Sequence, residues 1–282
     1  MPDPAKLLLQ IHRAAMIQNT QSGRSGRLLD LAAGDSILVA GDLHGQLDIL
    51  RRILLLADLS NQKSRHLVLQ EVLHGPFTYE DGSDKSHQAL DLVAALICQY
   101  AGRVHFLPGN HELAQIHGRM IMKSDRLLNR VFEQGVQKAY GPKAPEFLEA
   151  YETLIESSPL AIRTPNRILL THSLPKAGAL DAFDLSLLKM GPVRQDFATG
   201  GGLYGLFWDR DTTADTVARF LEKCNSQWLV TGHIPLETGF EIRSERHVIV
   251  DCHHLPAGVV LAPMDKELGP QGIGAFGVRM DG

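Results

Sequence analysis

The segment Ile37-Leu-Val-Ala-Gly-Asp-Leu-His-Gly45 joins a short apolar run to a cluster of polar and glycine residues. Apolar runs of this length, rich in branched side chains, are typical of buried strands. Four further runs end in Asp, Asn or His in the same way. They are 104–107 before Pro108-Gly-Asn-His-Glu112, 168–170 before Thr171-His-Ser173, 228–230 before Thr231-Gly-His233, and 247–250 before Asp251-Cys-His-His254.

Helical patterns separate several of these runs, at Gln46–Leu59, Ser86–Tyr100 and Thr213–Cys224, and residues 5–20 also show helical spacing. Strands that alternate with helices predict an α/β fold. Ligands of such folds gather at the carboxyl ends of the strands. The sequence therefore predicts that the five polar clusters converge on one edge.

Composition excludes several classes of protein. The chain has 282 residues, a net charge of −4 and thirteen histidines, so no basic field indicates nucleic acid as a partner. The three cysteines, at 98, 224 and 252, lack the paired spacing of a zinc ribbon or a disulfide framework. The longest uncharged run, Cys252–Met264, is too short to span a membrane. With no signal-peptide pattern at the start, we expect a cytoplasmic protein with no membrane partner.

The polar clusters predict a metal site. Asp42 and His44 are two residues apart, so in an extended chain their side chains share a face. Asn110 and His111 are adjacent and should point in different directions. A mixed set of Asp, Asn and His suits manganese, iron or zinc. Two such ions can clamp the oxygens of an in-line displacement at phosphorus. A pair of ions also needs a bridging carboxylate.

The ordered motifs Gly41–Gly45, Gly109–Glu112, His172 and Gly232-His233 resemble the phosphoprotein phosphatase branch of the calcineurin-like metallophosphoesterases. Trp208-Asp-Arg210 is similar to the Trp-x-Arg of bacterial serine/threonine phosphatases of that branch. The resemblance covers roughly residues 37–260. It implies a four-layer α/β/β/α sandwich, with two mixed sheets flanked by helices. We expect one domain over 1–282, with a core at about 35–265.

The resemblance also implies roles for individual residues. Asp42 and His44 would hold one metal, and Asn110, His172 and His233 would hold the other. A hydroxide bridging two divalent ions would attack phosphorus, with manganese expected first and iron or zinc as alternatives. His111 would be the general acid for the leaving group. Arg210 would bind and stabilise the phosphate, which Asn110 would also contact.

The second motif of that family, Gly-Asp-x-Val-Asp-Arg-Gly, is altered here. An ungapped comparison places Gln70 at the bridging aspartate, Leu73 at the aspartate that supports the catalytic histidine, and His74 at a phosphate-binding arginine. We expect Glu71, shifted by one residue, to bridge the metals, and His74 to contact phosphate. Gln70 itself, or Asp81 or Asp84 of the acidic insertion, are the alternatives for the bridge.

The predicted function is hydrolysis of phosphate monoesters by a metal-dependent phosphoesterase similar to serine/threonine protein phosphatases. Its substrate would be a phosphorylated protein or a small phosphoester. One alternative is a nucleotide or dinucleoside polyphosphate hydrolase. The other is a non-catalytic phosphoprotein-binding module with a degraded site, suggested by the altered second motif. Nothing in the sequence indicates an oligomeric state.

Overall fold

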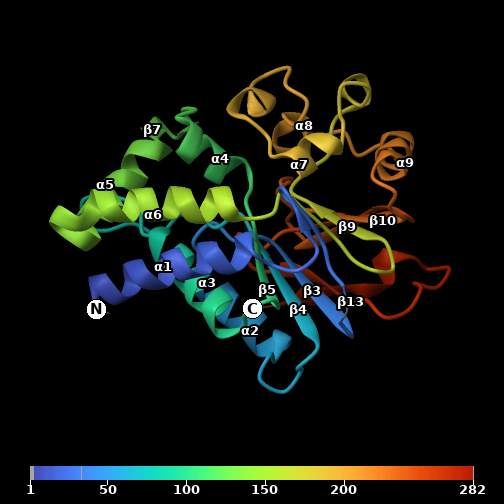
Figure 1. Cartoon of the computed structure of the whole chain (residues 1–282), viewed down its shortest axis with the longest axis horizontal. Helices are drawn as coiled ribbons and strands as arrows, with labels where there is room; N and C mark the ends of the chain where they lie inside the picture. Colours follow the sequence, from blue (N-terminus) through green and yellow to red (C-terminus); the bar gives the residue numbers. More distant parts are fainter. Residues whose placement is uncertain (1–2, 33, 282) are drawn as a thin grey trace.

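Two β-sheets face each other in the computed structural model, which describes residues 3–32 and 34–281 (Figure 1). One sheet has the order β1 (Arg24–Ser25), β2 (Leu28–Asp30), β8 (Ala161–Arg163), β9 (Ile168–Thr171), β10 (Trp228–Thr231), β12 (His247–Val250), β11 (Phe240–Ser244). The other has the order β14 (Gly277–Met280), β13 (Ala257–Pro263), β3 (Ser36–Asp42), β4 (Arg65–Gln70), β5 (Val104–Leu107). A small hairpin of β6 (Met122–Lys123) and β7 (Arg126–Leu127) lies apart from both.

Both sheets are mixed. Strands β3, β4 and β5 run parallel, as do β9, β10 and β12, whereas β13 and β11 pair antiparallel with their neighbours. An isolated parallel bridge between Asp42 and Asp251 joins the ends of β3 and β12. The carboxyl ends of the parallel strands therefore meet at one edge, as the sequence predicts.

Helices cover the outer face of each sheet (Figure 1). The amphipathic helix α2 illustrates the cause, since Ile49, Leu50, Ile53 and Ala57 form one buried stripe. Beside the five-stranded sheet lie α1 (Pro4–Asn19), α2 (Leu47–Ala57), α3 (His87–Gln99), α5 (Leu128–Tyr140) and α6 (Ala144–Ser157). Beside the seven-stranded sheet lie α7 (Ser186–Met190), α8 (Gly205–Trp208) and α9 (Ala214–Lys223).

A separate apolar cluster fills the space between the sheets. Ile37, Val39 and Val68 come from the five-stranded sheet, and Leu170 and Val230 from the seven-stranded sheet. With the two helical layers this gives the four-layer α/β/β/α sandwich, which confirms the predicted fold class.

The folded body extends beyond the core predicted at 35–265. Leu7, Leu8 and Ile11 of α1 are buried in the same apolar cluster as α3 and α6. At the other end, β14 pairs antiparallel with β13 and forms the edge of its sheet. The helical spacing of residues 5–20 predicts α1, whereas no motif marks β14.

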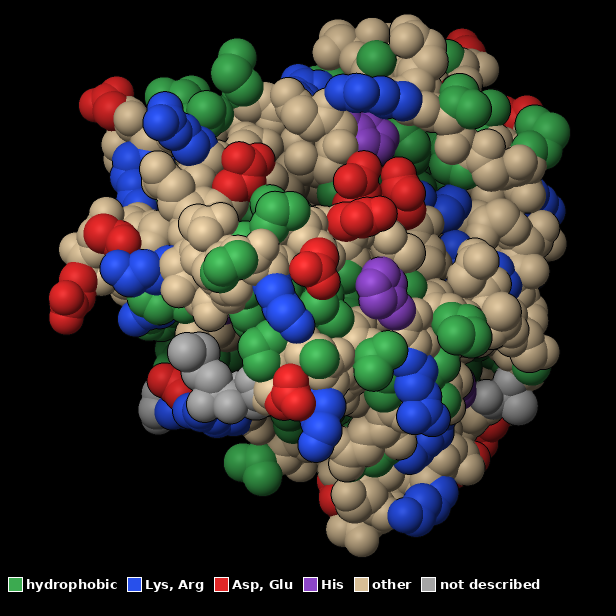
Figure 2. All heavy atoms as spheres, turned by 60° about the vertical axis from the view of Figure 1, so that its left-hand side comes forward, with side chains coloured by type: hydrophobic (Ala, Val, Ile, Leu, Met, Phe, Trp, Pro, Cys, Tyr) green, Lys and Arg blue, Asp and Glu red, His purple; other side chains and the backbone are tan. Residues whose placement is uncertain are grey.

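No helix among the described residues is long and apolar enough to cross a membrane. The face of the molecule in Figure 2 shows acidic and basic side chains interspersed.

Candidate metal centre

A cavity of about 270 Å³ opens at the edge where the parallel strands end. It brings together seven of the nine side chains singled out from the sequence: Asp42, His44, Glu71, Asn110, His111, Arg210 and His233. Lys123, Asp251 and His253 also line it. His172 is fully buried behind the cavity, and His74 lies behind His111.

Three ligand atoms converge around the Nε2 atom of His172. This atom lies 3.0 Å from Asn110 Oδ1, 3.1 Å from His233 Nδ1 and 3.5 Å from Glu71 Oε2. Asn110 begins α4 (Asn110–His117), directly after β5, whereas His172 and His233 follow β9 and β10. Two sheets thus supply one cluster that is suited to a metal ion.

Glu71 belongs to two groups that could hold a metal. One contains His44 and His111, and the other contains Asp42 and His172. Glu71 Oε2 lies 3.6 Å from His44 Nε2 and 3.5 Å from His172 Nε2. The backbone turns sharply at Glu71, which has a φ of 32°. This turn breaks the strand alternation that would otherwise direct its side chain away from the site.

The protein holds His44 with its Nε2 toward the carboxylate. Its Nδ1 lies 2.8 Å from the carbonyl oxygen of Leu73, which can only accept a hydrogen bond, so Nδ1 carries the proton. Burial lowers the pKa of His44 to about 4, and the ring is neutral near pH 7. The Nε2 lone pair is therefore available to a metal ion.

Glu112, to which the sequence analysis gives no role, anchors the altered segment. One of its carboxylate oxygens accepts hydrogen bonds from the backbone N–H groups of Val72 and Leu73, both at 2.8 Å. The other accepts from the N–H of Gly109 at 2.8 Å. A Cβ at Gly109 would lie 2.4 Å from Glu71 Oε1, so only glycine allows Glu71 to pack here. The motif Gly109–Glu112 and the altered second motif are thus built as one unit.

Several buried polar atoms at the site have no hydrogen-bond partner among the described residues. They include Asp42 Oδ1, His172 Nδ1 and both amide atoms of Gln70. Gln70 lies opposite Asp42 in the β3–β4 register, and a Cβ at Gly232 would approach both side chains. Unpaired buried polar groups are costly and rare, so this cluster indicates a site that binds a further group.

The carboxylates of the site repel one another. Burial raises the pKa of Asp42 well above its usual value, and the nearby Asp251 raises it further. Burial and the neighbouring Asp42 raise the pKa of Glu71 in the same way. Burial lowers the pKa of His172, assisted by His233. Buried acids surrounded by neutral histidines favour a divalent cation, because the cation would compensate the negative charge.

The ring of His74 has two side-chain partners within the protein. Its Nδ1 lies 3.0 Å from Nδ1 of His111, and its Nε2 lies 3.1 Å from Oε1 of Gln115. Both ring nitrogens are thus used within the protein. His74 does not line the cavity of the metal centre, but it lines an adjoining cavity of about 220 Å³ together with His44 and His253. The predicted contact with phosphate therefore stays a prediction.

The acidic insertion does not reach the metal centre. Asp84 accepts hydrogen bonds from the N–H and hydroxyl of Ser86, at 2.7 and 2.9 Å, just before α3. Asp81 pairs with Lys138 at 2.9 Å on the surface. In the described part of the chain, neither residue belongs to a group that could bind a metal. Both are therefore less suitable than Glu71 as the bridging residue.

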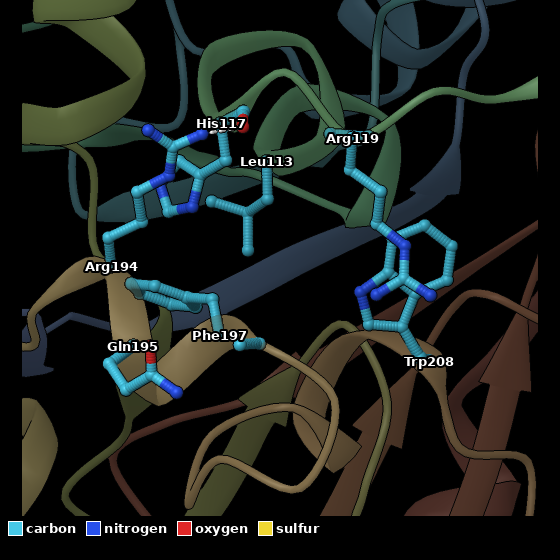
Figure 3. A pocket seen from close by; sticks show the side chains of 9 residues that line it. Leu113, His117, Arg119, Arg194, Gln195, Phe197 and Trp208 are labelled. Atoms are coloured by element: carbon cyan, nitrogen blue, oxygen red, sulfur yellow. Dashed lines mark hydrogen bonds between the residues drawn. The ribbon is translucent and has the colours of Figure 1, made fainter.

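Arg210 enters the cavity from the loop after α8. Its Nε lies 3.3 Å from Nε2 of His233. Two residues earlier, the Trp208 ring stacks against the guanidinium of Arg119, whose central carbon lies 4.1 Å from the ring centroid (Figure 3). Trp208 and Arg119 line a second cavity, of about 300 Å³, beside the site. Trp208 therefore packs against Arg119 and fixes the start of the loop that carries Arg210.

Asp251 and His253 form a further pair that the sequence indicates only through their position after a strand. His253 Nδ1 lies 2.7 Å from both oxygens of Asp251. Asp251 also accepts a hydrogen bond from the N–H of Leu236 at 2.7 Å. The pair closes the cavity wall next to Asp42.

Comparisons with known proteins agree with this geometry. The family model described as calcineurin-like phosphoesterase matches residues 36–237. The chain belongs to this family. The matched range begins at β3 and ends just after His233, so it includes all nine singled-out residues.

The relatives include protein phosphatases. The chain is 24% identical over 236 residues to a probable serine/threonine-protein phosphatase of Encephalitozoon cuniculi, covering 76% of this chain and 45% of that protein. It therefore spans about half the length of that relative. A Saccharomyces cerevisiae serine/threonine phosphatase with similarity to human PP5 has the same fold (TM-score 0.67, 17% identity, 91% of this chain and 82% of that one). So does a cold-active protein-tyrosine phosphatase of a Shewanella species (TM-score 0.59, 16% identity, 87% and 78%).

Proposed function

We propose that this protein is a metal-dependent phosphoesterase that hydrolyses phosphate monoesters. The observation that carries the proposal is the position of Glu71, whose Oε2 lies about equally far from His44 Nε2, at 3.6 Å, and from His172 Nε2, at 3.5 Å. One carboxylate between two groups of ligands is the arrangement that a pair of metal ions requires.

In this proposal Asp42 and His44 would hold one ion, Asn110, His172 and His233 would hold the other, and the Glu71 carboxylate would serve both. Two divalent ions bound there would polarise a phosphoryl group and make a water nucleophile available near neutral pH. The donor set fits such ions, because it combines buried carboxylates with neutral histidines, and Asp42 Oδ1 has no hydrogen-bond partner among the residues that the structure describes. Manganese is our first choice of metal, with iron or zinc as alternatives.

The remaining residues position the substrate. Arg210 is exposed at the cavity mouth and binds phosphate oxygens with its planar guanidinium group, stabilising the charge of the transition state. The Asn110 side chain is in reach of the same oxygens, since it lines the cavity. His111, which lines the cavity at the start of α4, would be the general acid that protonates the leaving-group oxygen. Phosphorylated serine and threonine of proteins are the first substrates to test, as the names of two relatives suggest.

The test begins with chelated protein reloaded with manganese, iron or zinc. We expect close to two ions per chain by elemental analysis, and hydrolysis of 4-nitrophenyl phosphate that depends on the added metal. Asp42→Asn should abolish both the second ion and the activity. Asp48→Asn is the matched control, because Asp48 is exposed at the start of α2 and pairs only with Arg51.

Fewer than one bound ion under saturating conditions would contradict the two-metal proposal and favour a phosphoprotein-binding module. A panel of phosphopeptides, nucleotides and dinucleoside polyphosphates then separates a protein phosphatase from a polyphosphate hydrolase. We further propose a cytoplasmic location. The three cysteines, Cys98, Cys224 and Cys252, are all free thiols, which suits a reducing compartment.

A further inference from the structure

The cavity of about 300 Å³ beside the metal centre shares a helix with it (Figure 3). Asn110 and His111, at the start of α4, line the metal centre, whereas Leu113 and His117 of the same helix line the second cavity. At a rise of about 1.5 Å per residue, His111 and His117 are about 9 Å apart along the helix axis. An extended peptide covers this distance in about two or three residues.

The second cavity has an apolar floor between two arginines. Leu113 lies in the middle, Arg194 extends beside Phe197 on one side, and Arg119 lies against Trp208 on the other (Figure 3). Both Leu113 and Phe197 are buried. The described residues that line this cavity include no acidic side chain. Over such a floor a charged ligand would interact with the arginines more strongly than in water.

The charges of these two arginines are not compensated within the protein. Within residues 3–32 and 34–281, neither Arg119 nor Arg194 forms an ion pair with a carboxylate. Arg51, Arg163 and Arg219, by contrast, each pair with an aspartate. Acidic partners are not scarce, because the net charge of the chain is −4. Two uncompensated cations at one cavity favour an anionic ligand.

Both arginines are held in place by contacts that leave their charge available. The central guanidinium carbon of Arg119 lies 4.1 Å from the ring centroid of Trp208 and 5.2 Å from that of Tyr204. One of its nitrogens donates to the Tyr204 hydroxyl at 3.3 Å. Arg194 donates to the backbone carbonyl of His117, at the end of α4. The remaining N–H groups of a guanidinium match the oxygens of a carboxylate or a phosphate.

The excess of basic groups is confined to this part of the surface. A further cavity, of about 550 Å³, continues past Arg194. Its lining combines Arg24 and Arg27 with Glu152 and Glu156, so opposite charges offset one another there. The cavity beside the metal centre is therefore better suited to an anionic group than its neighbour.

We propose that the cavity between Arg119 and Arg194 is a subsite for an anionic side chain of a phosphoprotein substrate, two or three residues from the phosphorylated residue. This inference rests on the proposed function, because the phosphorylated residue must occupy the metal centre. The carboxylate of Asp or Glu and the phosphate of a second phosphorylated residue share the chemistry that the two guanidinium groups recognise. Arg210 binds the phosphate that is hydrolysed, so different arginines serve recognition and catalysis.

The first test compares peptides of one sequence around a phosphoserine, with Asp, Asn or Lys at the second or third position on either side. We expect kcat/KM of the metal-loaded protein to be about fivefold to tenfold higher with Asp than with Asn at the preferred position, mainly through KM. The reason is that one exposed ion pair contributes up to about fivefold. Added salt should reduce the difference. Equal kcat/KM for Asp and Asn at every position would overturn the proposal.

A further peptide distinguishes the two sources of negative charge. It carries a second phosphoserine at the preferred position. A higher kcat/KM than with Asp identifies phosphate as the preferred group, and a lower value identifies the carboxylate; both results support an anionic subsite. Hydrolysis of tripolyphosphate that depends on Arg194, without any preference among the peptides, would overturn the proposal.

The second test reverses the charge at position 194. In Arg194→Glu we expect the peptide with Lys to be hydrolysed faster than the peptide with Asp, whereas Arg194→Gln should only lower the Asp to Asn ratio, by about threefold to fivefold. Arg119→Gln should lower this ratio too. Any shift of Trp208 and Arg210 in that variant lowers kcat/KM for all peptides alike, so the ratio isolates the subsite. An unchanged preference for Asp in Arg194→Glu would overturn the proposal.

The matched control is Arg130→Gln. Arg130 is exposed on α5 and lines neither the metal centre nor the cavity between the two arginines. The Asp to Asn ratio should therefore equal that of the parent protein. A loss of the preference in this variant as large as in Arg194→Gln would assign it to overall charge and overturn the subsite.

A third measurement does not depend on hydrolysis. Fluorescent peptides that carry a non-hydrolysable phosphonate analogue of phosphoserine report binding to the metal-loaded protein through their anisotropy. We expect Kd to be about fivefold lower with Asp than with Asn, and this difference should vanish in Arg194→Glu. Equal Kd values would overturn the subsite. If the binding preference is present but no phosphopeptide is hydrolysed, the proposed function fails and the subsite stands. If the phosphopeptides are hydrolysed without preference, the subsite fails and the proposed function stands.

Discussion

Two sets of histidines with lowered pKa values distinguish the metal centre from the interior of the sheets. His44 and His233 follow strands at the site, whereas His105 and His247 lie within strands. Burial lowers the pKa in both sets, to about 4 for His44 and His233 and to about 3 for His105 and His247. All four rings are therefore neutral near pH 7.

The sets differ in what their ring nitrogens face. His105 contacts His66 at 2.9 Å, and His247 contacts the hydroxyl of Thr231 at 2.9 Å. At the site, Nε2 of His44 and Nε2 of the neighbouring His172 instead face the carboxylate of Glu71, and Nδ1 of His233 faces His172. A lowered pKa thus marks burial in both places. The metal centre differs because the lone pairs of several histidine nitrogens point toward one carboxylate.

The largest expected effect tests the carboxylate itself. Glu71→Gln keeps the size of the side chain but removes the charge that faces both groups of ligands. We expect the protein to lose both ions and kcat/KM to fall by about 10³-fold or more, since such ions supply several kcal/mol of transition-state stabilisation. Elemental analysis and phosphate-release assays measure the two effects.

The control for this variant is Glu80→Gln in the insertion, which should keep both ions. Two ions bound in the Glu71→Gln protein would refute the bridge. The neighbouring Gln70 would then be the next candidate, because its amide is buried beside Asp42 and has no hydrogen-bond partner within residues 3–32 and 34–281.

A smaller effect should separate the two sets of histidines directly. His172→Asn removes a ring whose Nε2 lies within 3.5 Å of three other ligand atoms. We expect it to lower kcat/KM by about 100-fold, because even partners of metal ligands contribute 10- to 100-fold. His105→Asn, equally buried, should change kcat/KM less than about threefold while it lowers stability to urea. Similar losses of activity in both variants would remove the distinction between the sets.

The smallest effect concerns pH and stability. Folding lowers the pKa of His247 from about 6.5 to about 3. As the pH falls, the unfolded chain therefore binds the extra proton before the folded protein does. The contribution of His247 to the free energy of unfolding is complete above pH 6.5 and is lost as the pH falls toward 3. The slope reaches about 1.4 kcal/mol per pH unit for one proton.

Urea denaturation of chelated protein between pH 7 and pH 5 tests this sign. Buried acids such as Glu112, whose pKa is raised by burial, act in the opposite direction, so the useful quantity is the difference between parent and variant. His247→Gln should be less sensitive to acid than the parent protein. An identical pH dependence of the two proteins would show that His247 titrates alike in both states.

The motifs predict most of the site because each one follows a strand. Asp42, Asn110, His172 and His233 come together for that reason, and parallel strands bring their carboxyl ends to one edge. The segment Gln70–His74 follows no such rule. The directions of its side chains depend on the positive φ values at Glu71 and His74. They also depend on Glu112, whose hydrogen bonds connect the segment to α4.

The α/β fold, the order of the polar clusters and the type of ligand can be predicted from the sequence, because they depend on local apolar runs and on residue type. The acid that faces both groups of histidines and the residue that contacts His111 from behind follow from the packing of distant segments. These contacts join segments that are distant in the sequence. At such a contact, a single turn of the backbone moves a side chain from one face of a strand to the other. Glu71 and His74 acquire their neighbours through such turns, and no local pattern records them.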